Sequence, residues 1–225
     1  MKKVQTSLLA RQVYDILLEE IVRRELKPNQ KLDVNQLADQ LSVSRTPVMD
    51  ALARLETDGL VLRRNRVGTF VTPLDKSVFI ASFQARDMVE QYVTPLSIAN
   101  LQPDDIINLR NLLASFTGLL IGVNDDTFDY TSYTRYDYDF HLTLIKLCGN
   151  RQIIEFYHSL NSHMQIARAY SRRALHRAQE GSEEHHQILQ AFADKDVNRA
   201  QLLQHTHLER SREGVLKIIE EHGFL

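Results

Sequence analysis

The spacing of apolar residues changes twice within the first seventy positions. Apolar residues first recur every four positions, which predicts a helix that ends before Pro28. This series consists of Leu9, Val13, Leu17 and Ile21, and Ile16 falls on the same face at helical spacing. A shorter apolar group follows, and after it an apolar series at helical spacing gives way to two short strand-like runs. The pattern therefore predicts helices followed by a small hairpin.

Two helix starts can be placed from capping residues. Asp33 is a good N-cap for a short second helix, which should end in a turn at residues 42–43. Ser44 is expected to cap a third helix. Because Pro47 has no N–H, the Ser44 hydroxyl should accept a hydrogen bond from the Thr46 amide instead. The short turn between these helices is typical of a helix-turn-helix pair.

The third helix has an apolar face and a mixed, outward face, at about 100° per residue. The inward face is formed by Val48, Ala51, Leu52 and Leu55. The outward face is formed by Thr46, Met49, Asp50 and Ala53, with Arg45 at its flank. An outward face of this kind is what the major groove of DNA would contact.

A hairpin with a basic tip is expected after the third helix. Gly59 ends the helix, residues 60–62 and 69–71 read as strands, and residues 63–68 form the tip. The tip contains Arg63, Arg64, Arg66 and Gly68. A solvated basic turn is the ordinary alternative. Beside a helix-turn-helix pair, a wing that approaches phosphates or enters a minor groove is favoured.

Beyond Thr72 the pattern is helical throughout. Pro73 marks a boundary, because proline disfavours continued strand pairing. We therefore expect a mainly α protein, with a winged helix-turn-helix domain over residues 1–72, a linker over 73–77 and an all-helical bundle over 78–225. The expected helices cover residues 75–100 with a kink at Pro95, 103–122, 126–148, 151–177, 183–194 and 196–221.

Composition narrows the class of protein. The chain has 225 residues, 43% apolar and 25% charged, which is ordinary for a soluble globular protein of one or two domains. Cys148 is the only cysteine, which excludes an internal disulfide, and no apolar run is long enough for a membrane span or a signal peptide. We therefore expect a cytoplasmic protein without a membrane partner.

Charge and histidine are unevenly distributed along the chain. Residues 1–72 contain 12 Lys+Arg against 9 Asp+Glu, whereas the remainder contains 15 against 20, within a net charge of −2. The two parts should therefore have different partners. All nine histidines lie beyond residue 140.

Three of these histidines and one aspartate lie on apolar helix faces. Asp137 and His141 are four residues apart, and they share a face with Phe140. His185 lies at the centre of the apolar face of residues 183–194. His207 lies on the apolar face of the last expected helix, whereas His205 points away from it.

The four polar side chains are therefore expected to face one interior, where they would need partners. A divalent metal would satisfy them together, because neutral imidazole and carboxylate are suitable ligands for zinc, nickel, manganese or iron. Ordinary hydrogen-bonded core histidines are the alternative, and Asp137 with His141 could form a simple i,i+4 pair.

Read together, the N-terminal residues resemble the GntR family of bacterial transcription regulators. The matching residues are Gln12 to Tyr14, Pro28 to Leu32, Leu37-Ala38, Val43 to Val48, Ala51-Leu52, Leu55, Gly59-Leu60 and Gly68 to Val71. The chain departs from the family at Met49-Asp50, where Arg-Glu is usual, and at Asn29, where a turn glycine is usual. The resemblance implies operator binding, with more of the affinity expected from Arg45, Thr46 and the wing. The candidate DNA-contacting residues are Arg45, Thr46, Pro47, Met49, Arg63, Arg64, Arg66 and Gly68.

Residues 78–221 resemble the FCD ligand-binding domain of the FadR-type branch of this family. The matching pieces are Asp137 with Phe140-His141, Gly149-Asn150, Glu184-His185 three before Ile188, and Ala200 seven before His207-Leu208. The resemblance implies that Asp137, His141, His185 and His207 hold a divalent metal, with zinc the first choice. It also implies that open coordination positions take water or a carboxylate effector. Arg86, four residues before Glu90, is either half of a helix salt bridge or the effector's carboxylate anchor.

Three functions are compatible with these observations. The leading hypothesis is a homodimeric transcription regulator whose operator affinity is changed by a small organic acid bridging the metal and Arg86. Dimer symmetry then predicts a palindromic operator with half-sites about one helical turn apart. A regulator that senses the metal alone is the second hypothesis. The third is a metal-dependent hydrolase, but no further residue is placed as a general base.

Overall fold

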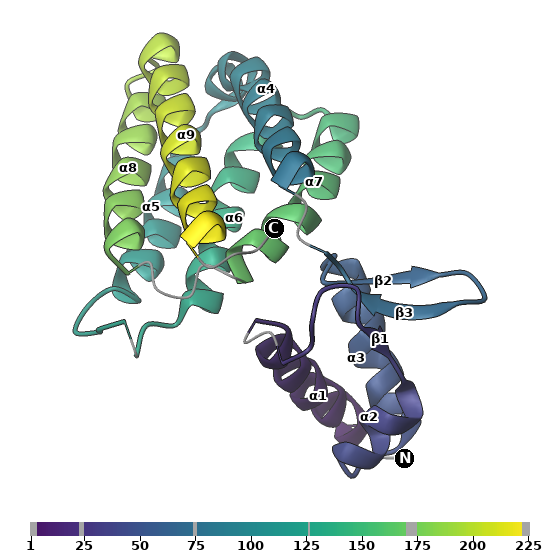
Figure 1. Cartoon of the computed structure of the whole chain (residues 1–225). Coiled ribbons are helices and arrows are strands. Elements are labelled where there is room, and N and C mark those ends of the chain that lie inside the picture. Colours follow the sequence, from purple (N-terminus) through teal and green to yellow (C-terminus); the bar gives the residue numbers. More distant parts are fainter. Residues whose placement is uncertain (1–3, 23–24, 74–75, 126, 170–174, 222–225) are drawn as a thin grey trace. The chain divides into compact units, whose positions relative to one another are not determined.

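The computed structural model describes residues 4–22, 25–73, 76–125, 127–169 and 175–221 (Figure 1). Its backbone forms two compact units. The first consists of residues 1–75 with residues 162–170, and the second of residues 76–161 with residues 171–225. The expected mainly α class is confirmed, since helices dominate the described chain and the strands form one small sheet.

The first unit has the elements of a winged helix-turn-helix, as the sequence predicts. A three-stranded antiparallel sheet, in the order β1-β3-β2, accompanies its helices. The elements are α1 (Val4–Val22), β1 (Lys31–Leu32), α2 (Val34–Gln40), α3 (Arg45–Thr57), β2 (Val61–Arg64) and β3 (Gly68–Val71).

The core of the first unit lies between α1 and α3. Val13, Leu17 and Ile21 of α1 are buried, and the apolar face of α3 is buried as predicted. Leu9 and Ile16, which the spacing also placed on the apolar face of α1, are instead exposed. Each fully buried Leu or Val contributes about 1.5–3 kcal/mol relative to an exposed one. The buried residues of α3 are Pro47, Val48, Ala51, Leu52 and Leu55.

Strand β1 was not predicted, because its two residues are stabilised by pairing with distant residues. Lys31 lies opposite Phe70 in β3, and the Asn29 N–H donates to the Val71 carbonyl at 2.9 Å. Asn29 has a φ of 63°, the left-handed conformation that asparagine tolerates better than most residues. This backbone geometry explains how asparagine can replace the usual turn glycine.

Two local predictions for this unit were wrong. The strands extend further than expected, so that β2 includes Arg63 and Arg64, β3 begins at Gly68, and the tip contains only residues 65–67. Ser44 occupies the N-cap of α3, but its side chain makes no capping hydrogen bond. Asp33, in contrast, accepts from two backbone amides at the start of α2, as expected.

In the described residues of the second unit, every secondary-structure element is a helix (Figure 1). Its central apolar cluster joins α4, α5, α6, α8 and α9, and Phe140, Ile188 and Phe192 are among its fully buried members. The helices are α4 (Lys76–Asn100), α5 (Pro103–Gly118), α6 (Tyr130–Lys146), α7 (Arg151–Ala169), α8 (Leu175–Ala193) and α9 (Val197–Glu221), and the last part of α7, residues 162–169, is assigned to the first unit.

Helix α4 continues through Pro95 because the neighbouring helix α9 supplies a replacement hydrogen bond. Proline has no N–H, so the carbonyl four residues earlier, that of Gln91, loses its usual helical donor. The Gln201 side chain donates to this carbonyl at 2.8 Å, and the Gln91 side chain donates to the Gln201 carbonyl at 2.9 Å. This reciprocal pair joins α4 to α9.

Several predicted helix ends were wrong. Helix α5 stops at Gly118 rather than at 122, and α6 begins at Tyr130 rather than at 126. Helix α7 ends at 169 and α8 spans 175–193, so Gly181 lies inside a helix rather than between two. A Cβ on Gly181 would lie 2.8 Å from the Tyr133 hydroxyl oxygen, so close packing accounts for glycine here. Residues 74–75 of the expected linker lie outside the described residues.

Candidate functional site

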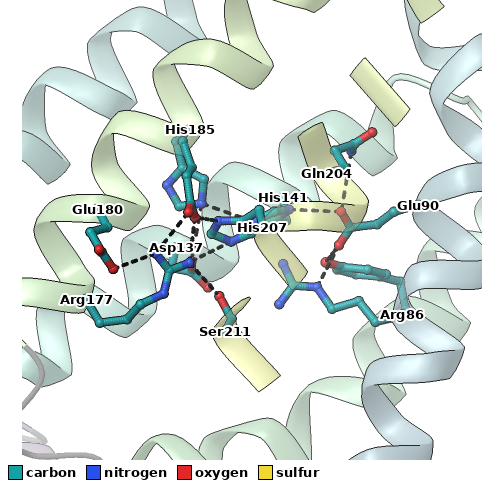
Figure 2. Close-up of polar contacts among 12 residues, drawn as sticks. Arg86, Glu90, Asp137, His141, Arg177, Glu180, His185, Gln204, His207 and Ser211 are labelled. Atoms are coloured by element: carbon teal, nitrogen blue, oxygen red, sulfur yellow. Dashed lines mark hydrogen bonds and ion pairs between the residues drawn. The ribbon is translucent and has the colours of Figure 1, made fainter. Parts of the chain in front are cut away.

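Four polar side chains from three helices converge in the core of the second unit. Asp137 and His141 come from α6, His185 from α8 and His207 from α9, and all four are buried. One ligand atom from each lies within 4.8 Å of the others. Figure 2 shows the imidazoles and the carboxylate turned toward one another. The structure thus brings together the four residues that the sequence placed on inward faces.

The distances within this group are those of atoms around a small cation. The Nε2 atom of His141 is 3.1 Å from that of His185 and 3.3 Å from that of His207. The Asp137 Oδ1 atom is 3.4 Å from His185 Nε2 and 3.8 Å from His207 Nε2. Ligands about 2.1 Å from a tetrahedral zinc ion lie roughly 3.4 Å apart. The group therefore fits a divalent metal without rearrangement of the helices.

Two carboxylates, of which Glu90 is buried and Glu184 half-buried, contact the Nδ1 atoms of two histidines. Glu90 Oε2 is 3.1 Å from His141 Nδ1, and Glu184 Oε2 is 2.7 Å from His207 Nδ1. An ionised carboxylate only accepts hydrogen bonds, so these Nδ1 atoms carry the hydrogen and the Nε2 atoms present lone pairs inward. The Nδ1 atom of His185 has no hydrogen-bond partner within the described part of the chain.

The electrostatics favour neutral histidines and ionised glutamates. Burial, together with the positive charge of Arg86, lowers the pKa of His141 to about 4. Burial also lowers the pKa of His185 to about 3. Burial opposes ionisation of Glu90, yet the hydrogen bonds from His141 and Arg86 and the charge of Arg86 hold the pKa of its carboxyl below the usual value. These protonation states are the ones that metal ligands and their supporting carboxylates require.

Arg86, the candidate effector anchor, is buried beside the candidate metal-ligand group. We use this name for Asp137, His141, His185 and His207. Its Nε donates to Glu90 Oε1 at 2.6 Å, so the expected i,i+4 pair is present. Figure 2 shows its guanidinium pointing toward the histidine cluster. Burial opposes the charged form, but Tyr157 and Glu90 raise the pKa of Arg86, which keeps it cationic.

The outward face of α3 is exposed as the helical pattern predicts. Arg45, Thr46 and Met49 are exposed, with Met49 50% accessible. Pro47 differs from these candidates, because it is buried against the core and its side chain is absent from the exposed face. Its contribution to a DNA-binding surface is therefore limited to shaping the first turn of α3.

Among the candidate wing residues, the three arginines are exposed and Gly68 is half-buried, and their local contacts differ. Arg63 Nε lies 3.6 Å from Glu56 Oε2, and the Arg64 guanidinium lies 4.9 Å from the centre of the Phe70 ring. Arg66 has a φ of 64°, a conformation that costs a non-glycine residue about 1 kcal/mol. Gly68 adjoins the side chain of Lys31, whose Cε lies 2.8 Å from where a Cβ on Gly68 would be.

Sequence reasoning missed Glu184, Tyr157 and Gln204 around the metal-ligand group. Glu184 precedes His185 directly, but it projects about 100° around the helix and reads as a surface residue. Arg177 and Arg210 bind its carboxylate from α8 and α9. Tyr157 and Gln204 each donate a hydrogen bond to Glu90, which contacts His141. Only the three-dimensional arrangement shows these contacts.

A winged helix-turn-helix unit in the same chain as a helical unit with a buried group of one aspartate and three histidines that could hold a metal is the architecture of a DNA-binding transcription regulator. Comparison with known proteins gives the family. Residues 9–71 match the model for bacterial regulatory proteins of the gntR family, and residues 81–210 match the FCD domain. The chain therefore belongs to the GntR family, in the branch with an FCD domain.

Similar proteins are regulators rather than enzymes. The Nta operon transcriptional regulator of Aminobacter aminovorans is 26% identical over 65% of this chain and 67% of its own length. The HTH-type transcriptional regulator YdhC of Bacillus subtilis is 26% identical over 75% of this chain and 73% of its own length. These relatives make the hydrolase hypothesis untenable, and this chain is a DNA-binding transcription regulator.

Solved structures with the same fold cover nearly the whole chain. E. coli McbR/YncC has a TM-score of 0.69 and 22% identity, over 93% of this chain and 97% of that one. A putative GntR regulator from Rhodococcus sp. RHA1 has a TM-score of 0.65 and 21% identity, over 92% and 97%. No helix in the described part of the chain combines the length and apolar character needed to cross a bilayer.

Proposed function

We propose that this regulator holds a divalent metal, zinc first, at Asp137, His141, His185 and His207, and that a small carboxylate effector bound there controls its operator affinity. The observation that supports metal binding most strongly is the convergence of three Nε2 atoms and one carboxylate oxygen in a buried space. The Nε2 lone pairs of His141 and His207, 3.3 Å apart, repel one another, and a cation between them removes that repulsion. Nickel, manganese or iron would use the same donors.

The proposal assigns the effector's carboxylate to the metal and to Arg86. When bound, the metal supplies a Lewis-acidic position for a carboxylate oxygen. Arg86 is a buried cation beside the group, and guanidinium binds carboxylate in a directional way. Since the ligands come from α6, α8 and α9, an acid that prefers one arrangement of these helices would shift their relative populations.

Operator binding is assigned to the exposed part of α3 and to the wing. Arg45, Thr46 and Met49 face outward, with Pro47 shaping the turn beneath them. The contacts from the wing are assigned to Arg63, Arg64, Arg66 and Gly68. Met49 replaces the family's arginine, so the phosphate and base contacts rest more on Arg45 and the wing.

We further propose a cytoplasmic homodimer that binds a palindromic operator. Large apolar side chains are exposed along α4 and on α9, beside the pair formed by Gln91 and Gln201. They are Met88 (62%), Tyr92 (65%), Leu96 (40%) and Leu202 (65%). An apolar stripe of this kind on a symmetric assembly is typical of an isologous contact.

The test is a fluorescence anisotropy titration of the purified protein with its own promoter region, at several salt concentrations. Metal-free protein, zinc-loaded protein and zinc-loaded protein with added acids are compared. The proposal predicts salt-dependent, site-preferring binding that an acid changes at least about 5-fold. If zinc alone sets the affinity, the protein is a metal sensor. If neither zinc nor acid matters, the control mechanism proposed here is wrong although operator binding remains.

The effector can be sought in the same preparation. Native protein is denatured, and the released small molecules are identified by mass spectrometry. A small organic acid in near-stoichiometric amount supports the proposal, and its addition to metal-loaded protein should reproduce the change in operator affinity.

A further inference from the structure

Glu90 is a fully buried carboxylate between the candidate effector anchor and a candidate metal ligand. It lies on α4 with an accessibility of 0%. Its Oε1 atom accepts from Arg86 Nε at 2.6 Å and from the Tyr157 hydroxyl at 2.9 Å. Its Oε2 atom is 3.1 Å from His141 Nδ1 and accepts from Gln204 Nε2 at 3.4 Å. Figure 2 shows Glu90 between Arg86 and His141.

The two oxygens of this carboxylate therefore serve different halves of the site. Oε1 holds the Arg86 guanidinium, and Oε2 fixes the hydrogen of His141 on Nδ1. The Gln204 side chain is held in turn, because the Thr94 hydroxyl donates to its oxygen at 2.6 Å. Because an ionised carboxylate shares one negative charge between its two oxygens, a stronger hydrogen bond at one oxygen leaves less charge for the contacts of the other.

We propose that Glu90 is a positioning residue that couples the effector anchor Arg86 to the metal ligand His141, so that metal and carboxylate bind cooperatively. This inference rests on the proposed function. When His141 Nε2 donates its lone pair to a cation, its Nδ1–H becomes more acidic and draws the Glu90 charge toward His141. The hold of Glu90 on Arg86 then weakens, and the guanidinium becomes a better partner for an incoming carboxylate. By reciprocity, a carboxylate on Arg86 improves the metal site.

Glu184 provides a matched control within the same site. It supports His207 as Glu90 supports His141, at 2.7 Å from Nδ1. Its arginine partners are Arg177 and Arg210 rather than Arg86. Loss of either glutamate should therefore weaken the metal site, but only Glu90 should carry the coupling.

The experiment measures the zinc affinity of the full-length protein by isothermal titration calorimetry, with and without acetate or succinate. In the wild type, an acid should tighten zinc binding by about 5-fold or more. Glu90→Gln should weaken zinc binding by about 10–100-fold and reduce the effect of the acid to the part that direct coordination of the acid to zinc supplies. Glu184→Gln should weaken zinc binding over the same range but keep the effect of the acid.

Each outcome bears on a different claim. A wild type that binds no zinc overturns the proposed function. A wild type whose zinc affinity does not respond to either acid, or a Glu90→Gln variant that keeps the full wild-type effect of the acid, overturns the coupling alone. Circular dichroism and melting temperature establish whether both variants are folded.

A measurement on the wild type keeps the inference testable if Glu90→Gln does not fold. In zinc-loaded protein labelled with ¹⁵N-histidine, the Nδ1–H resonance of His141 should move when acetate is added. The resonance of His207, which is hydrogen-bonded to Glu184, should move less. Resonances that both stay, or that move equally, contradict a role specific to Glu90.

Discussion

The proposed DNA-binding surface and the proposed metal-ligand group differ in how their side chains are held. Arg45, Thr46 and Met49 lie exposed on a helix whose opposite face forms the core. His141 and His185 are themselves core residues, with accessibilities of 1% and 0%. In the first unit, binding residues can therefore change with little effect on stability. In the second unit, binding and stability depend on the same side chains.

The largest effect is expected from His207→Ala on α9, with His205→Ala as its control. His207 is buried in the ligand group, whereas His205 is exposed and contacts Asp87. Loss of His207 should weaken zinc binding by more than about 100-fold, beyond the loss expected for a supporting partner. Isothermal titration measures the change. Equal zinc affinities of the two variants would show that His207 is not a zinc ligand.

The metal-free protein should lose stability as the solution becomes acidic. Burial lowers the pKa of His141 to about 4 and that of His185 to about 3, against about 6.5 in the unfolded chain. Below pH 6.5 the unfolded state therefore binds more protons, and the free energy of unfolding falls as the pH drops toward these values. Melting curves from pH 7.5 to 5 measure this effect. An unchanged melting temperature over this range would contradict buried neutral histidines.

Arg45→Ala should weaken operator binding without destabilising the protein. Arg45 is exposed at the start of α3, and the loss of one base contact costs about 1–3 kcal/mol. Arg110→Ala, an exposed change of equal charge on α5, is the control. Anisotropy and melting curves measure both variants. A large drop in the melting temperature of Arg45→Ala would show that the separation between binding and stability fails in this unit.

A smaller effect is expected from Arg66→Gly at the wing tip. Glycine adopts the φ of 64° without strain, so the stability should stay equal or rise by up to about 1 kcal/mol. The loss of one cation should reduce the slope of log affinity against log salt by about 1. An unchanged salt dependence would mean that Arg66 does not reach the DNA.

Local patterns predicted the helix faces, and the helix faces predicted the four clustered residues. Asp137 and His141 share a face by spacing alone, and His185 and His207 lie on apolar stripes of their own helices. The wing and the capping role of Asp33 follow from equally local signals. Resemblance to a known family then identified which inward polar residues belong together.

Features that depend on distant partners were not predictable in this way. Strand β1 exists because Lys31 pairs with Phe70, far along the chain. Gly181 looks like a helix end, but it lies inside α8, where it packs against Tyr133 of α6. Glu184 projects away from the apolar stripe of its own helix and meets His207 only through the packing of α8 on α9. These contacts between helices complete the site.

The most direct test of the central claim is a zinc titration of metal-stripped wild-type protein, with the bound metal counted by elemental analysis. The account predicts one zinc ion per chain, bound tightly enough to survive desalting and released when the histidines are protonated in acid. A folded protein that retains no zinc, nickel, manganese or iron above background would contradict it. Asp137 and the three histidines would then be an ordinary buried polar cluster.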